Sequence, residues 1–256
     1  MPEHLIVTAR YSSTRLPGKM LLPLGDNSVL GHSISRAKSA GFVPLLCTST
    51  DRTDDALVAE ATKHGVQSYR GELFNKIQRW KDCFSVLNLR DAHIVDGDDP
   101  YFDTDEIFES LSCLRMNSLD LVRTSKRSDS GFATVGMSVT ANFLTELAKR
   151  CEALPSSDLD VLPWSLLLSS TDKVRTAQDT FLIPNKTLQI RLTLDYLEDL
   201  YVMNAIAKAF GSDTPRKDIE EYLSQNPEIL SLNSHRTSDF LTNKKVQLEH
   251  NFQIES

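Results

Sequence analysis

The sequence predicts an α/β fold, in which helices cover both faces of a doubly wound, mostly parallel sheet. Short apolar runs that suit buried strands alternate with amphipathic, helix-like segments over about the first 120 residues. The segments that follow are less regular and predict a small antiparallel element in the second half. Ligands of an open α/β sheet bind beyond the carboxyl ends of its strands, so the polar stretches there are the first candidates for function.

The first half contains four predicted strand–helix pairs. The expected strands cover residues 4–9, 43–48, 66–69 and 92–95, and the expected helices cover 28–40, 53–64, 73–87 and 104–116. Gly41 and Gly65 directly follow two of these helices, as a helix-ending glycine does. Thr53 is placed to cap the second helix, with Asp54 and Asp55 in the first turn, where carboxylates favour the helix dipole. The loops that begin at Arg10, Ser49, Arg70 and Asp96 should therefore meet at one edge of the sheet.

The second half carries weaker signals. The expected strands cover 119–122, 133–139 and 188–194, and the expected helices cover 141–151, 195–210 and a segment that begins at Pro215. We divide the chain into a main domain, residues 1–210, and a C-terminal helical extension and tail, residues 211–256. The last part of this tail is polar, and we expect it to be loosely held.

Composition excludes several classes of protein. The 256 residues carry a net charge of −7, so there is no bulk electrostatic case for binding nucleic acid. Apolar runs are too short to cross a membrane, and the start of the chain does not resemble a signal peptide. The four cysteines form no C-x-x-C pair, which favours free thiols in a reducing compartment. We therefore expect a cytoplasmic protein without nucleic-acid or membrane partners.

The most informative motif is Arg10-Tyr-Ser-Ser-Thr-Arg-Leu-Pro-Gly-Lys19, directly after the first strand. It contains three cations and three hydroxyl groups, and Pro17-Gly18 predicts a turn. Backbone N–H groups in a turn, together with Arg and Lys side chains, commonly bind phosphates. The motif lacks the Walker pattern, and a solvated basic loop is the plain alternative.

Two acidic motifs lie further along the chain. Asp96-Gly97-Asp98-Asp99 ends the fourth strand, where carboxylates can bind Mg²⁺ but can also form a solvated turn. Asp195 begins a predicted helix and by itself is explained as a helix N-cap. No histidine or cysteine has partners that suggest nucleophilic catalysis.

The run A-R-Y-S-S-T-R-L-P-G-K closely resembles the nucleotide-binding signature of the sugar cytidylyltransferases, which include acylneuraminate, 3-deoxy-manno-octulosonate and spore-coat polysaccharide protein F-like members. The resemblance extends to Gly97-Asp98-Asp99-Pro100 and to the D-x-x-E-D-L run at Asp195. It implies a Rossmann-like nucleotide-diphospho-sugar transferase fold and a homodimer. It also implies that Arg10 and Lys19 contact the CTP phosphates, and that Asp98 and Asp195 bind Mg²⁺ as catalytic metal ligands. The nucleotide site that it implies comprises Ala9, Arg10, Ser13, Arg15, Lys19, Arg70 and Gly97.

Looser similarity covers Cys47–Asp55 and the segment with Arg70 and Arg79. Either arginine is as well explained by a structural role as by contact with the nucleotide or sugar, and Asp99, at a variable position of its motif, should be exposed. For the acceptor, Arg79 and Arg191 are candidate contacts, and Arg123 and Lys126 are further candidates for its carboxylate. An R-E-H-V-T-P-Y-like segment of relatives is replaced here by Leu159–Trp164, without the Arg or His. Sugar recognition has therefore diverged, or this segment serves subunit packing.

These residues predict a Mg²⁺-dependent cytidylyltransferase that transfers CMP from CTP to an acidic, ulosonate-type sugar for surface polysaccharide biosynthesis. Three alternatives stay open. The enzyme could use another nucleotide or acceptor, since the base pocket of the family is largely backbone. Asp96-Gly97-Asp98 also fits the D-x-D of a nucleotide-sugar glycosyltransferase. The altered Asp160–Trp164 segment leaves room for a non-catalytic nucleotide-binding homologue.

Overall fold

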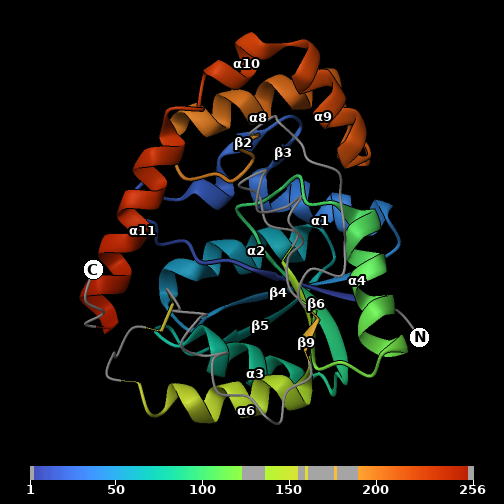
Figure 1. The fold of residues 1–256 in the computed structure, drawn as a ribbon, viewed down its shortest axis with the longest axis vertical. Helices are drawn as coiled ribbons and strands as arrows, with labels where there is room; N and C mark the ends of the chain where they lie inside the picture. Colours follow the sequence, from blue (N-terminus) through green and yellow to red (C-terminus); the bar gives the residue numbers. More distant parts are fainter. Residues whose placement is uncertain (1–2, 123–135, 155–158, 161–175, 178–189, 253–256) are drawn as a thin grey trace.

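A seven-stranded sheet forms the centre of the protein (Figure 1). The computed structural model describes residues 3–122, 136–154, 159–160, 176–177 and 190–252. The strand order is β5-β4-β1-β6-β8-β7-β9, and a separate hairpin is formed by β2 (Pro23–Leu24) and β3 (Asn27–Ser28). The fold class predicted from the sequence is confirmed, including a mostly parallel sheet and a small antiparallel element.

Four parallel strands form the half of the sheet that matters most for function. They are β1 (His4–Thr8), β4 (Val43–Ser49), β5 (Gln67–Gly71) and β6 (Asp91–Asp96). Thr8 lies opposite both Cys47 and Asp96, so the carboxyl ends of the neighbouring strands are level. The loops after these strands therefore begin at one edge of the sheet, as the sequence predicted.

The remaining strands extend the sheet beyond β6. β8 (Met137–Thr140) runs antiparallel to β6, and β7 (Leu121–Val122) pairs antiparallel with β8. β9 (Thr176–Ala177) pairs in parallel with β7. Antiparallel neighbours, unlike parallel ones, need no crossover connection of the βαβ kind.

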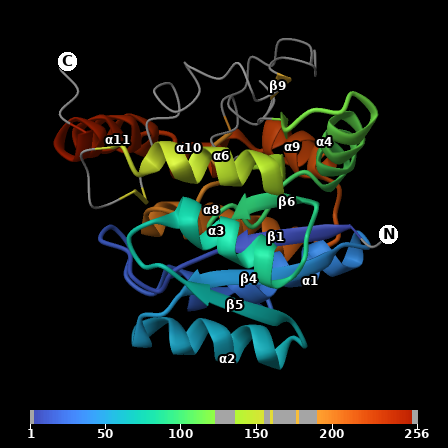
Figure 2. The same cartoon turned by 90° about the horizontal axis from the view of Figure 1, so that it is seen from below.

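Helices cover both faces of the sheet (Figures 1 and 2). α3 (Lys76–Val86) and α6 (Ala141–Cys151) pack together on one face, around a core that includes Trp80 and Phe143. The other core cluster collects side chains of the helices α1 (Val29–Ser39), α2 (Asp55–Lys63), α4 (Thr104–Met116) and α8 (Leu197–Ala209). Both apolar faces of the sheet are thereby buried, as a parallel sheet requires.

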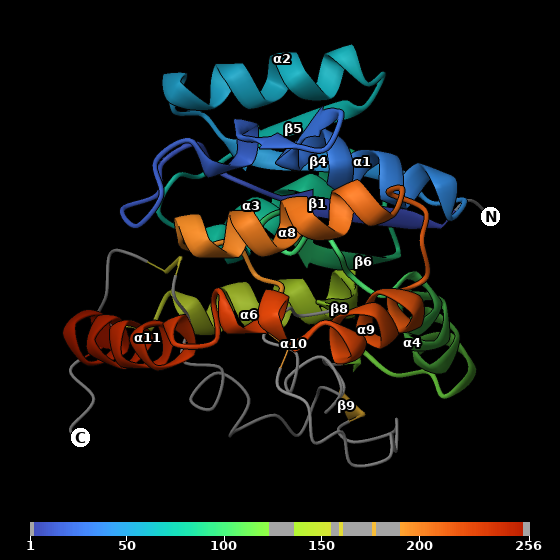
Figure 3. The ribbon, with the colours of Figure 1, turned by 90° about the horizontal axis from the view of Figure 1, so that it is seen from above.

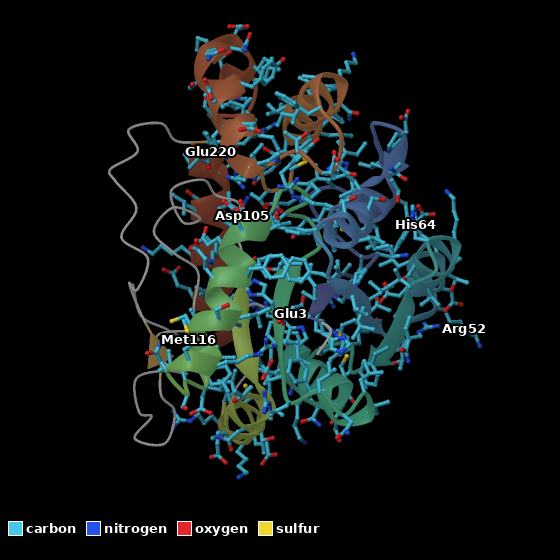
Figure 4. The ribbon with its side chains drawn as sticks, turned by 90° about the vertical axis from the view of Figure 1, so that its right-hand side faces the viewer. Glu3, Arg52, His64, Asp105, Met116 and Glu220 are labelled. Carbon is cyan, nitrogen blue, oxygen red and sulfur yellow. The ribbon has the colours of Figure 1, made fainter. Side chains whose placement is uncertain are left out.

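The two edges of the molecule are also helical. In Figure 4, His64 and Arg52, at the two ends of the α2 region, lie on the opposite side of the molecule from Met116, the last residue of α4. Arg52 belongs to the short 3₁₀ helix η2 (Arg52–Asp54), and a second one, η1 (Lys19–Leu21), follows the cationic loop. No helix among the described residues is long and apolar enough to span a bilayer.

Three helices make up most of the described part of the C-terminal extension. α9 (Arg216–Gln225), α10 (Pro227–Ser231) and α11 (Arg236–Phe252) follow α8 (Figure 3). Ile219, Leu223 and Leu230 of this extension are buried in the same core cluster as α8. The polar tail that we expected to be loosely held is instead the helix α11 as far as residue 252.

Three local predictions are wrong. Residues 190–194 join no strand of the sheet, because their backbone bonds elsewhere: the Leu194 N–H to Asp98 and the Arg191 carbonyl to Asn233. Asp195 does not cap α8; Tyr196 stands at the N-cap, and Asp199 accepts bonds from the N–H groups of residues 195 and 196. Thr53 does not cap a helix either, since it lies within η2.

Candidate active site

The loops after β1 and β6 meet at a glycine. The Gly97 N–H donates to the Thr8 carbonyl at 2.8 Å, which continues the pairing of the two strands into the loops. A Cβ atom at Gly97 would lie 2.8 Å from Met20 and 3.2 Å from both Ala9 and the Thr8 carbonyl oxygen. A side chain at position 97 would therefore push the cationic loop away from the acidic one.

A buried aspartate fixes the start of the cationic loop. Asp54 accepts hydrogen bonds from Thr48 and Ser49 at the end of β4, and from the Tyr11 N–H at 2.7 Å. Further along the loop, the Ser13 hydroxyl accepts a bond from the Leu16 N–H. Gly18 follows with a φ of 66°, a conformation that favours glycine. The loop shape is thus set by its own turn residues and by the neighbouring strand.

Lys19 brings the two acidic motifs together. Its ammonium nitrogen lies 2.5 Å from Asp98 Oδ2, 3.2 Å from Asp195 Oδ1 and 2.7 Å from the Leu194 carbonyl oxygen. Lys19 is only 8% exposed. Burial by itself lowers the pKa of Lys19, but Asp98 and Asp195 outweigh it and raise that pKa above its ordinary value. The lysine is therefore a permanent cation, shared by carboxylates that lie 97 residues apart in the sequence.

Asp195 binds three cations at once. Besides Lys19, its carboxylate accepts from Arg15 at 2.5 Å and from Arg191 at 3.2 Å, and its side chain is 2% exposed. Burial raises the pKa of the Asp195 carboxyl, but Lys19 and Arg15 outweigh burial and hold that pKa below its ordinary value. We call these four side chains, Asp195, Lys19, Arg15 and Arg191, the inner cluster. With Asp98 bound to Lys19 and Asp199 bound to Arg191, its three cations are balanced by three carboxylates.

Arg191 is turned into the protein. Its guanidinium forms two bonds with Asp199, at 2.8 and 3.0 Å, in addition to its bond with Asp195. The residue is 2% exposed. A contact between Arg191 and the acceptor stays a prediction, and in this structure the arginine faces two carboxylates.

Arg10 and Arg79 form a second, outer cluster around Asp160. Arg10 donates to Asp160 at 2.5 Å and to the Leu73 carbonyl at 3.2 Å. Arg79 donates to the other oxygen of Asp160 at 3.3 Å and to the Glu72 and Leu73 carbonyls. Arg10 and Asp160 are each about one fifth exposed, at 21% and 22%, whereas the Arg79 side chain is 2% exposed. A carboxylate of the protein thus lies where Arg10 would meet an anionic ligand.

The structure separates the remaining candidates from these two clusters. Arg70 donates to the Ser49 and Asp51 carbonyls and to Asp55, so it braces the loop after β4. Asp99, which we expected to be exposed, is 3% exposed; this prediction is wrong because the loop after β6 turns inward to bury Tyr101 and Phe102. Arg123, Lys126 and residues 161–168 lie outside the described residues.

Sequence reasoning missed two residues. Asp54 was assigned to a helix dipole, although its place in the Cys47–Asp55 stretch, which is loosely similar to the family, was a usable signal for a role beside the nucleotide loop. Asp160 was noticed only as part of a diverged segment. Nothing in its local sequence indicates that it lies beside Arg10, which is 150 positions away.

Two carboxylates and one carbonyl oxygen surround the Lys19 ammonium. These oxygen atoms are also suitable ligands for a metal cation. No group of three or more His, Cys, Asp or Glu side chains with metal-binding geometry occurs in the part of the chain that the structure describes. Mg²⁺ does not require such a group, because one or two carboxylates suffice when phosphate oxygens and waters complete its coordination. The donor set of Asp98 and Asp195 therefore fits Mg²⁺ bound together with a nucleotide.

Comparison with known proteins decides the family. The family model described as Cytidylyltransferase matches residues 4–131, half of the chain, including the cationic loop and Asp98. The chain belongs to the cytidylyltransferase family. Its predicted class, a CTP-dependent nucleotidyltransferase, is confirmed by this match.

Similarity to individual relatives extends beyond the half of this cytidylyltransferase that the family model matches. The spore coat polysaccharide biosynthesis protein SpsF of Bacillus subtilis is 25% identical over 236 residues, which cover 87% of this chain and 94% of the relative. A 3-deoxy-manno-octulosonate cytidylyltransferase of Methylococcus capsulatus is 34% identical over 111 residues, 39% of each chain. A cytidylyltransferase structure from Leptospira borgpetersenii, also 25% identical, has a TM-score of 0.75 and covers 90% of this chain and 97% of its own.

Proposed function

We propose that this cytidylyltransferase transfers CMP from CTP to an acidic sugar of the ulosonate type and releases pyrophosphate, with Mg²⁺ as its metal. The observation that carries the proposal is the meeting of Lys19, Asp98 and Asp195 at one point beyond the strand ends. The names of the matched relatives, which include a 3-deoxy-manno-octulosonate cytidylyltransferase and a spore coat polysaccharide biosynthesis protein, support the acceptor class and a role in polysaccharide biosynthesis.

The reaction needs no nucleophile from the protein. A hydroxyl oxygen of the sugar forms a bond to the α-phosphorus of CTP, the bond from that phosphorus to the bridging oxygen breaks, and the hydroxyl proton leaves to solvent. Positioning and charge neutralisation then supply most of the acceleration. Arg15 and Lys19 are placed to exchange their bonds with Asp195 for bonds with phosphate oxygens.

This exchange of partners frees the carboxylates of Asp98 and Asp195 to bind a metal ion. Once Arg15 and Lys19 turn toward phosphate, oxygen atoms of Asp98 and Asp195 become available to Mg²⁺. Mg²⁺ bound there would polarise the α-phosphate and stabilise an incoming alkoxide. Arg191, through Asp199, keeps Asp195 in place while its other partners move. Arg10 joins the phosphate site when it leaves Asp160.

The proposal is tested by pyrophosphate release. Purified protein is mixed with Mg²⁺, CTP and a panel of 2-keto-3-deoxy acids, and released pyrophosphate is measured against UTP, GTP and ATP controls. We expect release with CTP and at least one acid, and its loss in Asp98→Asn. Cleavage of an intact nucleotide sugar without pyrophosphate would instead identify a glycosyltransferase, and CTP binding without turnover of any acceptor would contradict the proposed transfer.

The assembly and location of the enzyme stay proposals as well. We infer a homodimer from the family resemblance, and light scattering coupled to gel filtration tests it at a mass of twice the 28.7 kDa chain. We also propose a cytoplasmic location, where CTP is available. The mass of a single chain at the protein concentrations used for the activity assay would contradict the homodimer.

A further inference from the structure

The C-terminal extension reaches the inner cluster through a buried asparagine. The Asn233 side-chain amide donates to the Arg191 carbonyl at 3.0 Å and to Asp199 at 2.9 Å, and the residue is 1% exposed. Asp199 in turn accepts the N–H groups of Asp195 and Tyr196. Asn233 therefore binds both ends of the segment that carries Asp195.

An aromatic ring of the same extension lies over two cations of the inner cluster. The centre of the Phe240 ring is 5.9 Å from the Arg15 guanidinium carbon and 5.2 Å from that of Arg191. Cations are attracted to the face of an aromatic ring at such distances. Lys244, one turn later in α11, also lies 5.9 Å from the ring centre. Arg15 is thus in contact with both Asp195 and Phe240.

The path of α11 makes these contacts rigid. α11 runs along the side of the molecule (Figure 1), and Leu248, near its end, packs against the core cluster of α3 and α6. At its start, Arg236 donates to Glu198 of α8 at 2.7 Å. The helix is therefore attached on both sides of Phe240, which fixes the ring relative to the strand ends.

We propose that Asn233 and Phe240 are positioning residues of the active site, and that residues 233–240 of the C-terminal extension complete the nucleotide site. Asn233 holds the Asp195 segment in register with Lys19. Phe240 sets the direction of the Arg15 guanidinium, so that this arginine can pass from Asp195 to a phosphate without losing its orientation. A flat guanidinium that lies on a ring keeps its donors in one plane, which suits phosphate. This inference rests on the proposed function of the same site.

The ring is tested with two substitutions, one of which removes the aromatic ring and one of which keeps it. Phe240→Leu keeps an apolar side chain but removes the ring face, and Phe240→Tyr keeps the face. Leu241→Ala, at an exposed neighbour on α11, is the matched control. We expect Phe240→Leu to raise the KM for CTP about threefold to thirtyfold, with a smaller change in kcat. Phe240→Tyr should restore the KM, and the melting temperatures of the two variants should agree within about 3 °C.

Asn233 is tested against another asparagine of the extension. Asn233→Ala should lower kcat about tenfold, because Asp195 is no longer held in register. Asn226→Ala removes a side-chain bond to the Tyr222 carbonyl away from the inner cluster, so it reports the effect of stability alone. Equal kcat values in these two variants would overturn the role of Asn233, and equal KM values in Phe240→Leu and wild type would overturn that of Phe240.

Calorimetric titration with Mg·CTP separates this inference from the proposed function. If the wild-type protein binds CTP but turns over no acceptor, the proposed transfer fails. The inference about Phe240 is still decided, because Phe240→Leu must then bind CTP about threefold to thirtyfold more weakly than Phe240→Tyr. Equal dissociation constants would overturn it.

Discussion

The inner and outer clusters pair carboxylates with cations at the same edge of the sheet, but in opposite surroundings. Asp195 is 2% exposed and binds three cations, whereas Asp160 is 22% exposed and binds two. A buried charge must stay compensated, and removing Asp195 would take one carboxylate partner from each of its three cations. A partly exposed ion pair contributes less to stability and is more easily exchanged than a buried one. We therefore expect the inner cluster to stabilise the fold, and the outer pair to compete with the proposed nucleotide for Arg10.

Asp195→Ala should have the largest effect. Lys19, Arg15 and Arg191 would lose a shared carboxylate in a buried setting, and breaking a buried pair in this way costs about 3–5 kcal/mol in the free energy of unfolding. Chemical denaturation measures the loss, with Asp82→Ala on the exposed side of α3 as the control. We also expect no measurable CTP turnover. A stability equal to that of the control would mean that the inner cluster is not structural.

Lys19→Met should affect the nucleotide more than the fold. Asp195 keeps Arg15 and Arg191, and Asp98, at 26% exposure, keeps access to water. The loss of one hydrogen bond to a charged group, about 1.5–3 kcal/mol, should raise the KM for CTP about tenfold to a hundredfold. Steady-state kinetics tests this against Lys63→Met, a lysine with a 72% exposed side chain. An unchanged KM would remove Lys19 from the nucleotide site.

Asp160→Asn should have the smallest effect on stability. Its effect on the KM for CTP should be opposite in sign to that of Lys19→Met. The Arg10–Asp160 pair is partly exposed, so its loss should change the free energy of unfolding by less than about 1 kcal/mol. Arg79 keeps its bonds to the Glu72 and Leu73 carbonyls. Because Arg10 is released, the KM for CTP should fall.

The control for Asp160→Asn is Glu146→Gln on α6, which breaks an ion pair with Lys149; the Glu146 side chain, at 28%, is about as exposed as that of Asp160, at 22%. A raised KM in Asp160→Asn, with Glu146→Gln unchanged, would show that Asp160 assists binding. The distinction between the two clusters would then no longer hold.

The sequence by itself determined the parallel half of the sheet and the three motifs that form the centre of the candidate site. Its strand and helix periods fixed elements such as α4 and α6 to the residue, because local burial patterns agree with the final packing there. The dense motifs at Arg10–Lys19, Asp98 and Asp195 contain the groups that the fold brings into contact. Local sequence carries such information when a turn, a strand end and a charge pattern coincide.

Only the tertiary structure decided which charges pair. Asp195 looked like a helix cap, yet it bonds to Arg15 and Lys19 from a loop about 180 residues earlier in the chain. Asp160 and Asn233 gave no local signal, because their partners come from other parts of the chain. Hydrogen bonds and ion pairs act over a few ångströms, so they depend on distances that the sequence leaves open until the sheet and the C-terminal helices are packed.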